Sequence, residues 1–388
     1  MTATLRDSRS RTHVSLDYHL LAFLIACGLA FVTPKASACP FCTAVAPSLA
    51  QERDSDDIVA LAEVVDISGK PYRFNLHRVI KGAEDLTDPK TLSANLSIAV
   101  KQGSLVILFG NRQESTIDWT AVEVNEASAA YFVHAPPLRE LEADRLEYFA
   151  PFLEHADSTI AEDAYREFGR AHLDAVKKVV DRIPNDRVRE WLTSPAVPES
   201  RKGFYGLLLG LAREERDRTA NAELLKSLIL ADADDFRSGF DGLLGGYLLL
   251  TGADGLTLLE QRYFANPKAA VGDVRHAMTA LRFFQEYGRE IPPEKLAAAL
   301  AQVLVRPEFA QAAITDLARW QRWEFVDRIA DLYDASTSTS EIRRAIIGYL
   351  RACPNAPAET RLTQLRAKDP TGVTAAEEVL TKLGTLPQ

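Results

Sequence analysis

The chain has 388 residues, of which 47% are apolar and 26% are charged, a composition typical of a folded protein long enough for two or three domains. Its 54 Asp and Glu residues outnumber its 45 Lys and Arg residues, which gives a formal net charge of −9. A chain this acidic is not expected to bind nucleic acid, because neutralising phosphates requires clustered basic residues. No apolar run of about 20 residues follows the N-terminal region, which excludes a protein with several membrane spans.

The N-terminal region has the pattern of a secretory signal peptide. Three arginines within the first 11 residues precede the apolar stretch Leu20–Val32 and the small-residue site Ala36-Ser37-Ala38. We therefore predict that residues 1–38 are a signal peptide, and that the protein is exported to the periplasm, the cell envelope or the extracellular space, with no membrane span after processing. Two alternatives are an uncleaved N-terminal anchor and a lipid anchor at Cys39, although lipidation sites usually carry Leu where Ala36 stands.

Cleavage after Ala38 would leave Cys39-Pro40-Phe41-Cys42 at the new N-terminus. An oxidising compartment permits a disulfide between Cys39 and Cys42. A structural disulfide is the preferred interpretation; the alternatives are a redox pair and the capture of a metal or a partner. Redox pairs of this spacing stand at the start of a helix, which lowers the thiol pKa, and Pro47 would interrupt such a helix here. A c-type haem site is excluded because Thr43 stands where His is required.

The next region, from Ile58 to Val133, has the texture of β-structure. Ile58–Val65 is a β-branched run, residues 69–71 indicate a turn, and the alternation over residues 72–79 is typical of a half-buried strand. We expect three further strands at Leu96–Val100, Leu105–Phe109 and residues 119–124, with residues 131–133 as another. About five short strands indicate a small barrel or sandwich. Pro136-Pro137 marks the end of this region.

Helical periodicity begins after Leu138 and continues to the end of the chain. Thr159 and Glu162 have the spacing of a capping box for the first of these helices. Comparable apolar positions then recur at intervals of 33 to 40 residues, each preceded four residues earlier by another apolar residue. The first set is Phe168, Leu208, Leu248, Phe284, Leu317 and Leu350, and the second is Ala164, Phe204, Leu244, Ala280, Ala313 and Ile346. A helix pair repeated at this interval indicates an α-solenoid.

Two resemblances follow from these residues. The helical part, about residues 138–383, resembles a HEAT-type repeat array, most clearly at Arg343–Leu350, and this implies stacked helix pairs that bind protein along a groove. Residues 39–133 resemble the netrin-like module of tissue inhibitors of metalloproteinases, a small OB-type barrel that begins with cysteine. Cys39, Asp57–Val64 and Val79–Gly82 carry this likeness. The inhibitors begin Cys-x-Cys and bond to cysteines within the module, whereas residues 43–133 here contain none.

The motifs of common enzyme classes are missing from the sequence. It contains no zinc-binding His-Glu-x-x-His, no Gly-x-Ser-x-Gly and no Gly-rich phosphate loop. Gly242, Gly245 and Gly246 lie in an apolar helix and predict close approach between helices rather than a phosphate site. We expect no metal and no cofactor.

One cluster is a candidate for partner binding. Arg319, Trp320, Arg322 and Trp323 lie near a predicted turn between helices, and Trp and Arg are common binding anchors. The alternative is that both indoles only lock that turn.

The sequence thus predicts a β-then-α protein with three parts. These are a signal peptide over 1–38, a small OB-like β-barrel or sandwich over 39–135, and an all-α HEAT-like solenoid over 136–388. The expected function is that of an exported, non-catalytic scaffold whose solenoid binds a protein partner, with the β module as an accessory. The alternatives are a thiol-disulfide oxidoreductase that uses Cys39 and Cys42, and a protease-inhibitor-like module that uses the Cys39 amino terminus.

Overall fold

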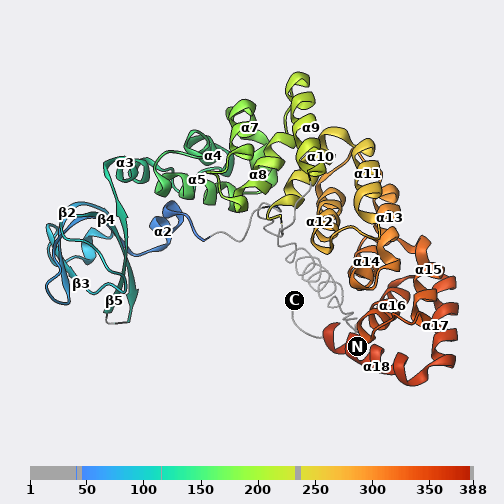
Figure 1. Cartoon of the computed structure of the whole chain (residues 1–388). Coiled ribbons are helices and arrows are strands. Elements are labelled where there is room, and N and C mark those ends of the chain that lie inside the picture. Colours follow the sequence, from blue (N-terminus) through green and yellow to red (C-terminus); the bar gives the residue numbers. More distant parts are fainter. Residues whose placement is uncertain (1–40, 42–45, 115, 232–236, 385–388) are drawn as a thin grey trace, which may run out of the picture. The chain divides into compact units, whose positions relative to one another are not determined.

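A computed structural model of the chain describes residues 41, 46–114, 116–231 and 237–384 (Figure 1). In these ranges a five-stranded antiparallel sheet is followed by helices, which confirms the predicted β-then-α layout. The strands are β1 (Ile58–Asp66), β2 (Tyr72–Lys81), β3 (Thr91–Ala94), β4 (Leu105–Gln113) and β5 (Thr116–Val124).

The sheet is an open, curled half-barrel with the order β3-β2-β1-β4-β5. Each neighbouring pair is antiparallel, and β1 is the central strand. A parallel bridge between Leu96 and Trp119 joins the segment after β3 to β5, which brings the two edges of the sheet toward each other. Partial closure of this kind leaves less strand edge open to solvent.

The two faces of the sheet have separate apolar cores, as the period of two along a strand requires. Ile58, Ala62 and Val64 of β1 contribute to one core, inside the curl. Val59 contributes to the other, which is covered by α2 (Leu49–Ser55) and α3 (Glu126–His134). One face of the sheet is therefore covered by two helices, of which α2 precedes the sheet in the chain and α3 follows it.

Two of the expected strands are wrong. Residues 96–100 are irregular, because Leu96 and Val100 are buried while Ile98 between them is 47% exposed, and the third strand lies earlier, at Thr91–Ala94. Residues 131–133 are helical, since Asn125 accepts hydrogen bonds from the N–H groups of Ala127 and Ser128 and starts α3. The capping prediction at Thr159 is also wrong, because Asp157 caps that helix.

The other α-helices of the described residues follow α3 in the chain. They are α4 (Glu142–Phe149), α5 (Ser158–Arg170), α6 (Leu173–Val179), α7 (Asn185–Thr193), α8 (Glu199–Gly210), α9 (Glu215–Leu230), α10 (Phe240–Thr251), α11 (Ala253–Leu259), α12 (Val271–Tyr287), α13 (Pro293–Ala301), α14 (Pro307–Arg319), α15 (Val326–Asp331), α16 (Ser340–Ala352), α17 (Ala356–Lys368) and α18 (Pro370–Gly384).

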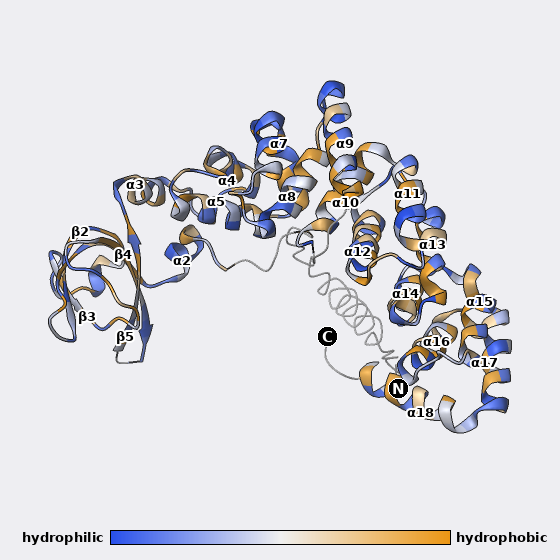
Figure 2. Ribbon diagram, viewed as in Figure 1, coloured by the Kyte–Doolittle hydropathy of each residue, from blue (hydrophilic) through white to orange (hydrophobic). Residues whose placement is uncertain are grey.

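Alternate helices form a continuous row. Helices α8, α10, α12, α14, α16 and α18 each contact the next in that order, and a second layer includes the contacts of α7 with α9 and of α15 with α17. All twelve of the apolar positions that recur in the sequence are at most 2% exposed and lie on α5 and on this row from α8 to α16. Figure 2 shows apolar residues concentrated along α8 and α10. This neighbour-to-neighbour packing is compatible with a helical solenoid.

Among the described helices, none is both long and apolar enough to cross a lipid bilayer.

Candidate functional site

Helices α8 and α10 approach each other closely because glycines face each other between them. A Cβ on Gly206 would lie 2.8 Å from the backbone nitrogen and Cα of Leu243, and one on Gly210 would lie 2.5 Å from the Cα of Gly246. Gly242 in turn faces the carbonyl oxygen of Gly203. The prediction of close helix approach is therefore confirmed for Gly242 and Gly246.

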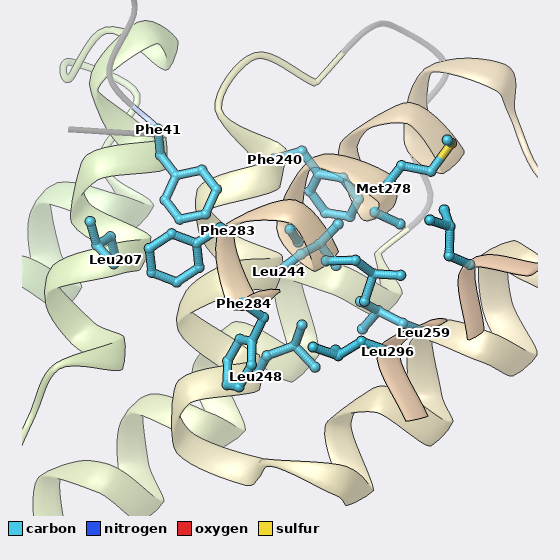
Figure 3. Close-up of a cluster of buried hydrophobic side chains, with 14 of the residues drawn as sticks. Phe41, Leu207, Phe240, Leu244, Leu248, Leu259, Met278, Phe283, Phe284 and Leu296 are labelled. Carbon is cyan, nitrogen blue, oxygen red and sulfur yellow. The ribbon is translucent and has the colours of Figure 1, made fainter. Parts of the chain in front are cut away.

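Gly245 has a different neighbour, the aromatic ring of Phe41. A Cβ on Gly245 would lie 2.5 Å from that ring, and the ring centroid of Phe41 lies 4.6 Å from that of Phe283 on α12. Phe41 is only 4% exposed, although its neighbours are more than 150 residues away in sequence. Figure 3 shows the ring of Phe41 above Phe283, with Leu207 of α8 beside them. The helical array thus buries the aromatic side chain of Phe41.

A groove of about 500 Å³ lies at the C-terminal ends of the same three helices and is also lined by residues of α6 and α9; it shares Phe283 with the surroundings of Phe41. On each of the three helices, a residue one or two turns after the one near Phe41 lines the groove. On α8 the stripe runs from Gly203 to Gly210, on α10 from Gly245 to Leu249, and on α12 from Phe283 to Tyr287. Positions spaced by three, four or seven residues lie on one face of a helix. Phe41 therefore stands at one end of a surface that extends into this groove.

The walls of the groove carry more positive than negative charge. Lys177, Arg213 and Arg218 line it together with Glu215 and Glu290. Arg213 lies 3.0 Å from Asp181 and donates to the carbonyl oxygen of Lys177 at 2.7 Å. Arg218 donates to the carbonyl oxygens of Leu250 and Ala212 at 3.1 and 3.2 Å. These arginines stabilise helix ends and still retain N–H donors, because a guanidinium has five.

A second feature is a buried polar cluster where the segment before the sheet meets α5. The backbone N–H of Leu49 donates to one carboxylate oxygen of Asp163 at 2.6 Å, and the hydroxyl of Tyr131 donates to the other at 2.8 Å. Ser48 donates to Glu167, which also pairs with Arg145 at 2.5 Å. Asp163 and Glu167 stand four residues apart on α5, so they project from the same face of that helix.

Burial controls the titration of both carboxylates, which are 2% and 4% exposed. Desolvation raises the pKa of Asp163, against the opposing effect of the hydrogen bonds from Leu49 and Tyr131. Desolvation also raises the pKa of Glu167, against the opposing charge of Arg145. An open pocket of about 480 Å³ adjoins the cluster and is lined by Leu49, Glu52, Val122, Arg201 and residues of α5, including Asp163. The hydrogen bonds of the cluster connect α2, α3 and α4 to the two carboxylates on α5, and they therefore attach α2 and α3 to the helical part.

The Arg–Trp cluster lies at the turn between α14 and α15. Trp320 and Trp323 are half-buried and pack against the helical core, and the Trp323 ring lies 5.2 Å from that of Tyr349 in an edge-on arrangement. Tyr349 donates through its hydroxyl to the carbonyl oxygen of Arg322. Arg319 is 74% exposed and lies 4.0 Å from Asp316. These contacts support the turn-locking interpretation, and partner binding by the cluster stays a prediction.

The predicted disulfide between Cys39 and Cys42 lies outside the described residues, so it stays a prediction. Cys353 is buried with a free thiol. Within the described ranges, no three His, Cys, Asp or Glu side chains gather as a metal site requires.

Comparison of the sequence with models of known protein families and with curated proteins found no match.

Sequence reasoning missed both of the main features described above. The anchoring of Phe41 has no local signal, because its neighbours are contributed by three distant helices. The pair of carboxylates, by contrast, has a local signal in the sequence. Asp163 and Glu167 flank the buried Ala164 and Phe168 on α5, and carboxylates on an apolar face indicate a buried polar contact.

Proposed function

We propose that the chain is an exported, non-catalytic scaffold that binds a protein partner through its helical array. The observation that carries this proposal is the groove across α8, α10 and α12, with an apolar floor and charged walls. Partner surfaces of this kind are common in helical solenoids, whose stacked helices present extended grooves. The finer assignment, a HEAT-like array, is supported by the recurrence of helix pairs and by the ordered contacts along the row from α8 to α18.

The β module is proposed as an accessory to the array, of the OB-like or netrin-like kind. Its strand order, with β1 flanked by β2 and β4, is consistent with a partly open barrel. The buried cluster of Asp163 and Glu167 supports a fixed attachment of the adjoining α2 and α3 to the array.

A structural role is proposed for the Cys39–Cys42 pair. Phe41 between them is buried against helices rather than against the sheet. Burial of the residue between the two cysteines supports a structural disulfide better than it supports a reactive thiol pair or an exposed N-terminal cysteine.

Photo-crosslinking tests the proposed function. A benzoylphenylalanine in place of Tyr287 puts the photoreactive group in the groove, and one in place of Tyr72 puts it on β2 as a matched aromatic control. We expect irradiation in the native cell envelope to join the Tyr287 variant, and not the Tyr72 variant, to one discrete protein that also binds the purified full chain. A discrete product from Tyr72 alone, or from neither variant, would refute binding by the array.

Export has a separate test in the mass of native material. Cleavage after Ala38 predicts a chain that begins at Cys39. A mass equal to that of all 388 residues would contradict cleavage, and an added diacylglycerol would assign the lipid-anchor alternative.

A further inference from the structure

We infer that the groove beside Phe41 binds an extended peptide that carries an aromatic side chain followed by carboxylates. This inference rests on the proposed function and names the chemistry of the partner. It follows from the aromatic surface that Phe41 already occupies, from the charge of the groove walls and from the length of the groove.

The preference for an aromatic group is argued from Phe41 itself. Its ring occupies the space that Gly245 leaves and contacts Phe283 at 4.6 Å. The aromatic surface does not end there, because Tyr287 lies 5.4 Å from Phe283 on the groove side, with an angle of 35° between the rings. Leu249 and Leu211, both half-buried, complete the floor. A second aromatic ring beside Phe41 would extend this stack and bury apolar surface on both sides.

The preference for carboxylates is argued from charge complementarity. Three cations line the groove against two carboxylates, in a chain whose overall charge is −9. The side chain of Lys177 is 39% exposed and its partner Asp174, 3.4 Å away, is 87% exposed, so solvent weakens that pair. The side chain of Arg213 is 59% exposed and its partner Asp181, 3.0 Å away, is 57% exposed, so solvent weakens this pair as well. Both cations can therefore turn to a peptide carboxylate and form charge-assisted hydrogen bonds with it.

The length of the groove sets the length of the peptide. At a rise of about 1.5 Å per residue, the seven steps along α8 from Gly203, beside Phe41, to Gly210, in the groove, span about 10 Å. An extended chain covers this distance in about three residues. A phenylalanine next to Phe283 and Tyr287 would thus be followed within two or three residues by side chains that face Lys177 and Arg213.

The test uses a fluorescent six-residue peptide with one phenylalanine followed by two aspartates, and the mature full-length protein. We expect saturable binding by fluorescence anisotropy, and a loss of affinity of about tenfold or more in Lys177→Glu and Arg213→Glu. Lys178→Glu and Arg216→Glu are matched controls, because these exposed neighbours reverse the same charges but do not line the groove. The controls should bind as the wild type does. Circular dichroism of each variant checks that the helical array is folded.

The aromatic requirement has its own control. A peptide with alanine in place of phenylalanine should bind about tenfold more weakly, and one with lysines in place of the aspartates should not compete. Equal binding of the alanine peptide, or equal losses in the control variants, would overturn the inference, because either result indicates unspecific attraction between charges. The inference also fails if a partner crosslinks at Tyr287 but no aromatic acidic peptide displaces it; the proposed function would then still hold. Absence of any partner at Tyr287 refutes the proposed function itself.

Discussion

The contact between α8 and α10 makes a sharp prediction for a single methyl group. In Gly206→Ala, the new Cβ would lie 2.8 Å from the backbone of Leu243, whereas ordinary contacts begin at about 3.4 Å. The two helices must therefore separate by at least 0.6 Å, the difference between 3.4 and 2.8 Å, because backbone atoms cannot rotate away. A gap of this size forfeits about a quarter to a half of the dispersion energy of each contact across it.

The expected cost is that of overpacking, about 1 to 3 kcal/mol, less about 1 kcal/mol from the better helix propensity of alanine. Gly348→Ala is the matched control, because its Cβ would meet only a side-chain methyl of Leu380, at 3.5 Å, in the interior of α16. That variant should gain up to about 1 kcal/mol. Because the helix-propensity gain of alanine is common to both variants, they should differ by the overpacking cost, about 1 to 3 kcal/mol.

Thermal unfolding followed by circular dichroism at 222 nm measures this difference. At about 2 to 4 °C per kcal/mol for a domain of this size, Gly206→Ala should melt about 2 to 12 °C below Gly348→Ala. Equal melting temperatures, or a more stable Gly206→Ala, would show that the helices are not in the close contact described.

Four further outcomes are expected. Leu248→Asp buries a charge at a position that is fully buried and should lower the free energy of unfolding by more than about 3 kcal/mol in urea titrations, unlike the same change at the exposed Leu383. The raised pKa of Asp163 means that ionisation of this carboxyl destabilises the folded state, so the stability of the wild type falls as the pH rises above about 4, the ordinary pKa of an aspartate. Asp163→Asn should therefore become more favourable relative to the wild type as the pH rises from about 4, and a difference independent of pH would contradict this. Trp323→Ala should reduce stability by about 2 kcal/mol through the lost contact with Tyr349, whereas weaker partner binding at unchanged stability would support the partner-binding prediction instead. The mature protein should not catalyse insulin reduction, and turnover that disappears in Cys39→Ser and Cys42→Ser would overturn a structural disulfide.

Periodicity was sufficient to predict most of the fold. Leu248 and Phe284, for example, were placed in the helical core from spacing alone, and both are buried. The two wrong strands have a shared physical cause. Both were short apolar runs, in which the period is too brief to distinguish a strand from a helix or an irregular segment. The N-cap at Asn125 starts the helix that contains residues 131–133. In residues 96–100 the side chain of Ile98 is exposed, so this segment does not bury one face as a strand of the sheet would.

The candidate site was harder to predict because its parts are joined only by long-range contacts. Ser48 and Glu167 are 119 positions apart, and Leu49 and Asp163 are 114 apart. Each residue has an ordinary local context, so its role depends on which distant element packs against it. The glycines of α10 were an exception. Close approach could be predicted from their number in one apolar helix, but the ring that occupies the space at Gly245 could not.

The described residues before the sheet contact the helical part at two places. Arg53 on α2 is 8% exposed and donates to the carbonyl oxygens of Ala135 and Pro136 at 2.7 and 3.2 Å, so α2 is tied to the end of α3. Phe41 is tied to α10 and α12. The contact of Phe41 with Phe283 joins positions 242 residues apart, so it can form only after α12 has been synthesised. Closure of so long a loop costs entropy before its contacts compensate. The contact of Phe41 therefore forms late in synthesis, on helices that also contact one another directly, α8 with α10 and α10 with α12.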